Sequence, residues 1–312
     1  QCVPFAGLAT TSTPPYSNQT TINFSINDQL FPSTIKPVRR ASLARILAGM
    51  EQDGGTFYWD VESSRVKHIV VRRKKGTRLM EELKLLLKLN NRNIIGYQSS
   101  LMDPVMKPVT IMKDSFQLSL GCFLQERFEN NEGPIDYLDA WTVAYDVLNG
   151  LNYLHREAHL VHGDICAYNV VFVGDFRRVM IASFECSQRV NRHGVVIPTQ
   201  PGSVAVYKGS ERWAAPEVSK LARRNPTTRY TVLVDIFSFG MMLYEMLVGV
   251  PPWSLPGDYR RNMKTLPRLD RERASNNFRL ILAIYDLSTL PASRRPTARQ
   301  LLFLLRNPAA CL

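Results

Sequence analysis

The sequence predicts an α+β protein in which a small strand-rich part precedes a larger helical part. Two strand-like runs, 56–61 and 66–71, combine β-branched and aromatic residues. Beyond residue 140 the apolar residues recur mainly at the spacing of an amphipathic helix. The chain has 312 residues, 45% hydrophobic and 21% charged, so it can bury one or two sizeable cores. This composition excludes wholesale disorder, collagen and coiled-coil rods. The helical segments are 141–154, 232–247 and 278–305.

The longest apolar run, 232–250, is interpreted as a buried helix. It contains Asp235, Gly240 and Glu245, and charged side chains are costly inside a bilayer, so no membrane span is expected. The five cysteines are too few for a disulfide scaffold in a chain of this length, so the core must be stable largely without crosslinks.

Residues 1–40 are expected to form a tail or a strap on the surface, because Thr, Ser, Pro and Asn are frequent and no apolar period is sustained. Asn18 and Asn23 each begin an Asn-x-Ser/Thr sequence, which predicts glycosylation if the chain is secreted. The sequence begins with Gln1, from which we expect that an initiator or targeting peptide has been cut away or lies outside this sequence.

Segment 43–50 is predicted to be an amphipathic helix. Its apolar residues fall at positions i, i+3, i+4 and i+7, behind Ser42 as a candidate N-cap and ahead of the pair Gly54 and Gly55. A second domain, 41–312, is expected to begin with this helix.

A basic segment lies between Arg65 and Arg92, with ten Lys or Arg and only Glu81 and Glu82 as acids. We interpret it as a solvated helix face beside a strand end, and the alternative is a docking patch for an acidic protein partner. The net charge of +12 attracts acidic proteins, nucleic acid or anionic lipid. Nucleic acid is not expected as a partner, because stacking aromatic residues are not interleaved with the basic ones.

The segment 162–169 carries a recognisable motif. Its sequence, His-Gly-Asp-Ile-Cys-Ala-Tyr-Asn, resembles the protein kinase catalytic loop, His-Arg-Asp-x-x-x-x-Asn. Further matches follow in the order found in kinases, and the resemblance implies a bilobal protein kinase-like fold. The N-lobe would cover about 41–115 and the C-lobe about 116–312. The further matches are Ala-Pro-Glu at 215–217, Asp-Ile-Phe-Ser-Phe-Gly at 235–240 and Arg-Pro-Thr at 295–297.

The resemblance also assigns structural roles. It implies a buried ion pair between Glu217 and Arg295 that ties the activation segment to the C-lobe, and it implies that Asp235 anchors the backbone of the catalytic loop. Removing one partner of such a buried pair costs about 3–5 kcal/mol, because the other charge is left without a partner.

The residues that hold a nucleotide and its metal in kinases are largely replaced. Counting along the strand pair places Ser183 at the Asp of Asp-Phe-Gly and Glu185 at its Gly, while Asp175 and Phe176 are assigned to the hairpin turn. Serine is a poor Mg²⁺ ligand. Arg72 takes the place of the phosphate-pairing lysine, where it keeps the charge and changes the shape.

Other positions of the kinase pattern are altered or vestigial. Glu82 is the expected helix partner of Arg72, an ion pair that can survive as a structural link. The predicted helix 43–50 replaces the Gly-rich loop, and side chains there obstruct the approach of phosphates to the backbone. Gly163 replaces the arginine of the catalytic loop. Two residues of that loop are retained: Asp164, at the position of the base in kinases, and Asn169.

These losses lead to the prediction of a catalytically inactive pseudokinase. It would act as a binding or scaffolding protein, with no catalytic residue, no metal and no cofactor, and it would not bind Mg-ATP. The alternative is an atypical active Ser/Thr kinase that uses Asp164 as base and holds metal through Asn169, alone or with Glu185.

A helix in place of the Gly-rich loop, combined with Ser-Phe-Glu at 183–185 in place of Asp-Phe-Gly, is also similar to the secreted rhoptry and dense-granule kinase group of apicomplexan parasites, including its with-no-Gly-loop branch and bradyzoite pseudokinase. That affiliation would imply secretion into the parasitophorous vacuole or cyst wall. The competing affiliation is an animal tyrosine-kinase-like pseudokinase, and a cytoplasmic location is the alternative to secretion.

The kinase-like fold would bring Cys166 and Cys186 onto neighbouring loops. They can form a disulfide in an oxidising compartment, although two free thiols are the preferred expectation.

Overall fold

In a computed structural model, residues 34–312 form one compact unit. For the strands formed by 35–37, 56–60, 65–71, 97–102 and 108–112 we describe the backbone alone. The predicted tail up to residue 33 and the predicted helix 43–50 lie outside the described residues. The structure describes residues 35–37, 56–60, 65–71, 87–102, 108–112, 116, 118–184, 186–198, 202–220, 229–254, 265–267, 269 and 278–308.

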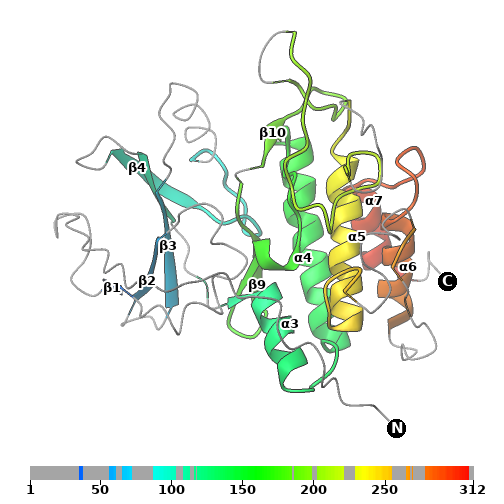
Figure 1. The fold of residues 1–312 in the computed structure, drawn as a ribbon, viewed down its shortest axis with the longest axis horizontal. Coiled ribbons are helices and arrows are strands. Elements are labelled where there is room, and N and C mark those ends of the chain that lie inside the picture. The colour runs from blue at the N-terminus through cyan, green and yellow to red at the C-terminus, as the bar shows by residue number, and fades with distance from the viewer. Residues whose placement is uncertain are drawn as a thin grey trace. The chain divides into compact units, whose positions relative to one another are not determined.

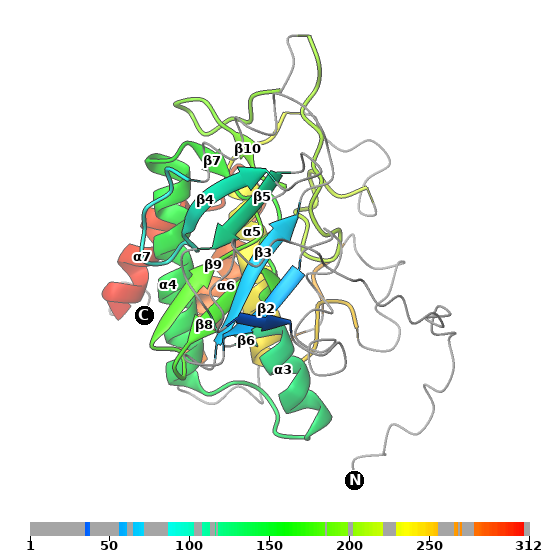
Figure 2. The same ribbon diagram turned by 90° about the vertical axis from the view of Figure 1, so that its left-hand side faces the viewer.

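The N-terminal part contains a five-stranded antiparallel sheet (Figure 2). Its order is β1-β2-β3-β5-β4, and the register of the central pair sets Thr56 opposite Ile69. The two strand-like runs predicted from the sequence form β2 and β3, while β1 lies within the segment expected to be a tail. The strands are β1 (Ile35–Pro37), β2 (Thr56–Asp60), β3 (Arg65–Val71), β4 (Tyr97–Met102) and β5 (Pro108–Met112).

Two smaller sheets frame the motif at 162–169. One has the order β6-β8-β9, with β6 (Leu118–Ser119), β8 (Val170–Val173) and β9 (Arg178–Ile181), and the other pairs β7 (Leu160–Val161) with β10 (Gln188–Arg189). The turn between β8 and β9 contains Asp175 and Phe176, both with positive φ. Their predicted role in a hairpin turn is confirmed, since β8 and β9 pair directly across it.

Five helices complete the described part of the chain, and α4 and α5 run side by side in Figure 1. The prediction of helices at 141–154 and 232–247 is confirmed. The helical spacing noted at 278–305 corresponds to two helices, which the segment containing Pro291 and Pro296 separates. The helices are α3 (Leu120–Glu129), α4 (Tyr137–Arg156), α5 (Leu233–Val248), α6 (Arg279–Ser288) and α7 (Ala298–Arg306).

Helix α5 lies at the centre of the core. Every residue from Val234 to Met246 is buried, including Asp235 and Glu245, and the helix packs against α4 and α6. It ends at Gly249, whose left-handed φ of 83° suits glycine at a helix C-terminus. In the part of the chain that the structure describes, no helix has both the length and the apolar character needed to cross a membrane.

Candidate active site

The loop 162–169 connects β7 to β8 and ends in a short 3₁₀ turn, Ala167–Asn169. Asp235 of α5 holds its start. One carboxylate oxygen of Asp235 accepts the backbone N–H of Gly163 at 2.8 Å, and the other accepts that of His162 at 2.8 Å and lies 2.8 Å from Nε2 of His155. The role implied for Asp235, anchoring the loop backbone, is present in the structure.

His162 links this loop to the end of β9. Its Nδ1 accepts the backbone N–H of Asp164 at 3.2 Å, and its Nε2 lies 2.9 Å from the carbonyl of Ala182. Both contacts are satisfied by a neutral ring with the proton on Nε2. Burial lowers the pKa of His162, which agrees with the neutral form. Phe184 packs edge-on against the same ring, with the ring centroids 5.0 Å apart.

The carboxylate of Asp164 is held from two sides. Its Oδ1 accepts the backbone N–H of Ser210 at 2.7 Å, and its Oδ2 accepts Nδ2 of Asn169 at 3.0 Å. The same Nδ2 also donates to the backbone carbonyl of Asp164 at 2.8 Å. Asp164 remains partly accessible to solvent, so it is an oriented proton acceptor that a hydroxyl group can approach.

The approach of Ser210 to Asp164 depends on glycine. A Cβ at position 209 would overlap the carbonyl oxygen of Gly163 and lie 2.6 Å from the hydroxyl of Tyr207, so a side chain cannot fit there without a shift. Gly163 itself has φ of 79°, and a Cβ there would lie 2.7 Å from the carbonyl of Cys186. Sequence reasoning missed Gly209 and Ser210, although a Gly-Ser pair a few residues before Ala-Pro-Glu was a usable signal.

Ser183 follows β9 and has φ of 63°, a left-handed conformation that is uncommon outside glycine. The buried Phe184 follows it directly, and the assignment of Ser183 to the Asp of Asp-Phe-Gly stays a prediction. Glu185, the third residue of that triplet, lies outside the described residues.

The resemblance implies a bound Mg²⁺, and the described side chains do not supply a suitable ligand set. Mg²⁺ prefers carboxylate oxygens, and Ser183 offers only a hydroxyl. Asn169 offers one amide oxygen, because its nitrogen donates to Asp164. Among the described residues no three His, Cys, Asp or Glu side chains cluster in a way that could hold a metal.

Arg295 and Glu217 form the buried ion pair that the resemblance implied. Nη1 of Arg295 lies 2.7 Å from Oε1 of Glu217, and Nη2 lies 3.3 Å from Oε2, a two-point contact. Arg295 also donates to the carbonyls of Leu233 and Leu290 and stacks over the ring of Phe237 at 5.1 Å. This network fixes the start of α5, and thereby Asp235, beside the segment that follows Ser210.

The structure contains no disulfide between Cys166 and Cys186, in agreement with the preferred expectation of two thiols. Cys166 is buried in the core, which raises the pKa of its thiol well above the usual value. The sulfur of Cys186 instead donates to the carbonyl of Lys208 at 3.5 Å. Cys166 therefore packs in the core, while Cys186 contacts the backbone of a different loop.

Several sequence-based predictions concern positions that the structure does not describe. They include the Arg72–Glu82 pair, the glycosylation of Asn18 and Asn23, and the helix in place of the Gly-rich loop. The docking patch between Arg65 and Arg92 also stays a prediction, because most of its side chains are not among those that the structure describes.

Comparison with known proteins gives a consistent result. Residues 60–303 match the family model described as the protein kinase domain. The chain is 28% identical over 230 residues to the human lymphokine-activated killer T-cell-originated protein kinase, a match that covers 68% of this chain and 69% of that protein. It is 31% identical over 179 residues to serine/threonine-protein kinase VIK of Arabidopsis thaliana, covering 55% of this chain and 36% of that protein. The mitogen-activated protein kinase kinase kinase YODA, also from Arabidopsis thaliana, is 28% identical over 305 residues, which cover 93% of this chain and 32% of YODA.

These comparisons correct one expectation. The prediction that the chain is not an enzyme is wrong, because the proteins to which it is similar are named protein kinases, several of them serine/threonine-protein kinases. The prediction rested on the loss of the Gly-rich loop together with that of the metal-binding aspartate at Ser183, and it gave too little weight to the retained Asp164. The apicomplexan affiliation and secretion stay predictions.

Proposed function

Because the chain belongs to the protein kinase family, we propose that it is an atypical serine/threonine protein kinase in which Asp164 is the base. The observation that carries the proposal is the position of the Asp164 carboxylate, held by the backbone of Ser210 at 2.7 Å and by Asn169 at 3.0 Å. A base must be oriented within hydrogen-bond reach of the proton that it accepts. This carboxylate is oriented before any substrate arrives.

The proposed reaction moves a phosphoryl group from a nucleoside triphosphate to a serine or threonine hydroxyl of a protein. The hydroxyl oxygen attacks the terminal phosphorus, and the bond between that phosphorus and the bridging oxygen breaks, releasing the diphosphate. Asp164 accepts the proton that leaves the hydroxyl. Asn169 donates to Asp164 on one side, which keeps the other lone pairs of the carboxylate available.

The loop is supported independently of Asp164 itself. Asp235 satisfies two backbone N–H groups at its start, and His162 satisfies a third at Asp164. Such a preorganised loop needs little rearrangement when substrate binds, and preorganisation is the main contribution of a protein to this kind of transfer. No step is assigned to a metal, since the described side chains do not form a magnesium site.

The identity of the phosphorylated residue tests this proposal. The purified chain is incubated with γ-labelled ATP and a mixture of protein acceptors, and the labelled amino acids are separated after acid hydrolysis. Labelled phosphoserine or phosphothreonine is the expected product. Label found only on tyrosine, or no label above that of heat-denatured protein, contradicts the proposal.

A further inference from the structure

Two adjoining cavities lie between α4 and α7, away from the catalytic loop. Their volumes are about 570 and 940 Å³, and both are lined by Asn152, Arg156, Arg299 and Phe303. Helix α7 is set against α4 at this place. Its start is fixed by a reciprocal cap, in which the side chain of Thr297 accepts the backbone N–H of Gln300 and the side chain of Gln300 accepts that of Thr297. We call this pair of cavities the arginine groove.

The arginine groove carries a strong positive charge. The single acidic residue in its lining is Glu157. None of its arginines forms an ion pair with a carboxylate of the described residues. The two whose side chains have a partner bind neutral groups: Arg306 donates to the hydroxyl of Tyr145 at 2.8 Å, and Arg192 donates to His193 at 3.1 Å. The arginines of the groove are Arg156, Arg192, Arg294, Arg299 and Arg306.

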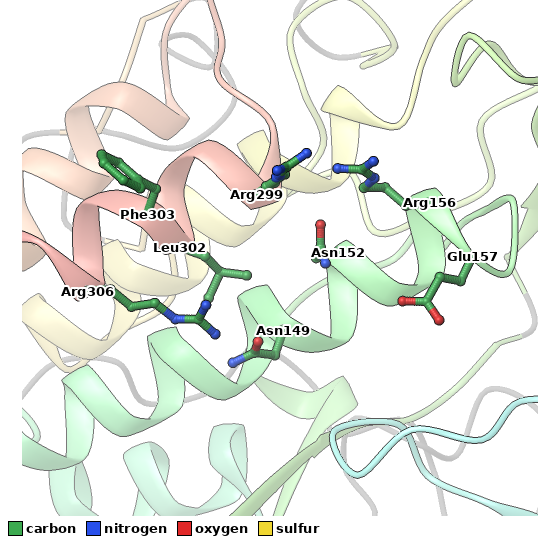
Figure 3. Close-up of a pocket in the computed structure, with 8 residues that line it drawn as sticks. All are labelled: Asn149, Asn152, Arg156, Glu157, Arg299, Leu302, Phe303 and Arg306. Carbon is green, nitrogen blue, oxygen red and sulfur yellow. The ribbon is translucent and has the colours of Figure 1, made fainter.

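Figure 3 shows how the central side chains lie. The guanidinium groups of Arg156 and Arg299 are on the same side of the cavity, and the amide oxygen of Asn152 points toward the space between them. The carboxylate of Glu157 is turned the other way. Two guanidinium groups facing one space repel each other, and a carboxylate placed there would relieve that repulsion with charge-assisted hydrogen bonds.

Asn152 adds a requirement that a simple anion does not meet. Its Oδ1 is buried and has no hydrogen-bond partner, a costly state for an acceptor. A carboxamide can accept from a backbone N–H and donate to a backbone C=O at the same time, so a peptide unit is its natural complement. This feature favours a polypeptide over inorganic phosphate.

Phe303 provides an apolar contact beside the charges. Its side chain is 59% exposed although it lines both cavities. An exposed aromatic residue beside arginines that form no ion pair with the described carboxylates is typical of protein–protein interfaces, where aromatic residues and Arg are enriched.

We propose that the arginine groove binds an acidic peptide segment of a partner protein. Carboxylates of the peptide bind Arg156 and Arg299, its backbone pairs with the Asn152 carboxamide, and an apolar side chain packs on Phe303. The partner segment is assigned a negative charge because the groove is lined by five arginines and a single glutamate. The groove shares no residue with the catalytic loop, so the inference does not depend on the assignment of Asp164 as base.

Binding of a labelled peptide tests the proposal. The probe is a twelve-residue fluorescent peptide of Asp, Glu and Ser with one central Leu, measured by anisotropy at physiological salt. We expect the double variant Arg156→Gln, Arg299→Gln to bind it at least about tenfold more weakly than the wild type, because it loses two charged contacts at exposed positions. The matched control is Arg177→Gln, Arg279→Gln, which removes the same charge from exposed positions elsewhere and should change the affinity by less than about twofold.

Two further arms identify the ligand class. Phe303→Ala should weaken binding of the Leu-containing peptide and leave a peptide with Gly in place of Leu unchanged. A single-stranded RNA of equal charge, and inorganic phosphate, should fail to displace the peptide. Equal losses in the double variant and in its control, no binding of the peptide by the wild type, or displacement by RNA or phosphate would each overturn the proposal. Arg156 and Arg299 are exposed, so the variants are expected to unfold at the wild-type temperature.

Discussion

The backbone N–H of Ser210 donates to Oδ1 of Asp164 at 2.7 Å, joining segments 46 residues apart. This contact ties the segment that precedes Ala-Pro-Glu to the catalytic loop. It makes the orientation of Asp164 depend on the path of a distant part of the chain. The following predictions test this dependence and the buried groups that support it.

Gly209→Ala should disrupt the contact without removing any polar group. The added methyl group would overlap the carbonyl oxygen of Gly163, so the backbone before Ser210 must shift away from Asp164. We expect phosphate transfer to fall by about 10²-fold, as is typical when a catalytic group is displaced by about 1 Å. Gly202→Ala is the control for backbone strain alone, because Gly202 has a left-handed φ of 77° but a Cβ there meets no atom within 4 Å. Initial rates of transfer measure both, and equal rates in the two variants would refute the dependence.

Asp235→Asn should destabilise the fold. An amide has one acceptor oxygen, so its nitrogen would face either the N–H of Gly163 or the N–H of His162 and leave a buried donor without a partner. We expect the free energy of unfolding in urea to fall by about 3–5 kcal/mol. Asp175→Asn, at an exposed turn position, is the control and should stay within about 0.5 kcal/mol of the wild type. A loss below about 1 kcal/mol for Asp235→Asn would show that its bonds are dispensable.

Glu245 should make stability depend on pH. Desolvation raises its pKa from the usual 4.5 to about 8, while the N–H of Trp213 donates to Oε2 at 3.1 Å and lowers the pKa in part. Between these two values the folded state holds a proton that the unfolded state has released. Stability therefore falls as pH rises through this window, by up to about 1.4 kcal/mol per pH unit, and levels off above the folded pKa.

Glu245→Gln removes that proton equilibrium and keeps an acceptor for Trp213. Urea unfolding at pH 5.5 and pH 7.5 should show the wild type losing stability relative to this variant. If the two proteins lose stability in parallel over this range, Glu245 is ionised in the folded protein and the prediction fails.

Ser183→Asp should increase binding of magnesium. The left-handed φ of 63° at this position is better tolerated by Asp and Asn than by most residues, so neither substitution should strain the loop. A carboxylate here supplies the oxygen ligand that the serine hydroxyl does not. We expect the melting temperature with Mg-ATP to rise more for Ser183→Asp than for the uncharged control Ser183→Asn. An equal response of the two variants would show that position 183 does not face the metal.

The sequence predicted those parts of the site that depend on local pattern. Asp164, Asn169 and Asp235 were found because their motifs have fixed spacing. The break between α6 and α7 was missed even though the prolines that cause it are visible in the sequence. Of the five strands of the N-terminal sheet, only β2 and β3 were predicted, from alternation and composition, and the sheet order required the structure.

Other features depend on tertiary contacts and could not be predicted from pattern. The contact of Ser210 with Asp164 joins distant segments. The sequence predicted that the helix around Glu245 is buried, but the raised pKa of Glu245 and its contact with Trp213 required the structure. Likewise Arg156 and Arg299 belong to different helices that only packing brings together. The error about enzymatic activity arose because the replaced Gly-rich loop, lysine and metal-binding aspartate were taken to outweigh the retained Asp164, whose carboxylate the fold orients.

The central claim is that Asp164 accepts a proton during phosphoryl transfer. Its most direct test is the initial rate at which the wild type, Asp164→Asn and the exposed control Asp175→Asn transfer labelled γ-phosphate to one protein acceptor. We predict measurable transfer by the wild type and by Asp175→Asn, and a loss of at least about 10²-fold for Asp164→Asn, the usual contribution of a general base. Equal rates for Asp164→Asn and the wild type would contradict the account.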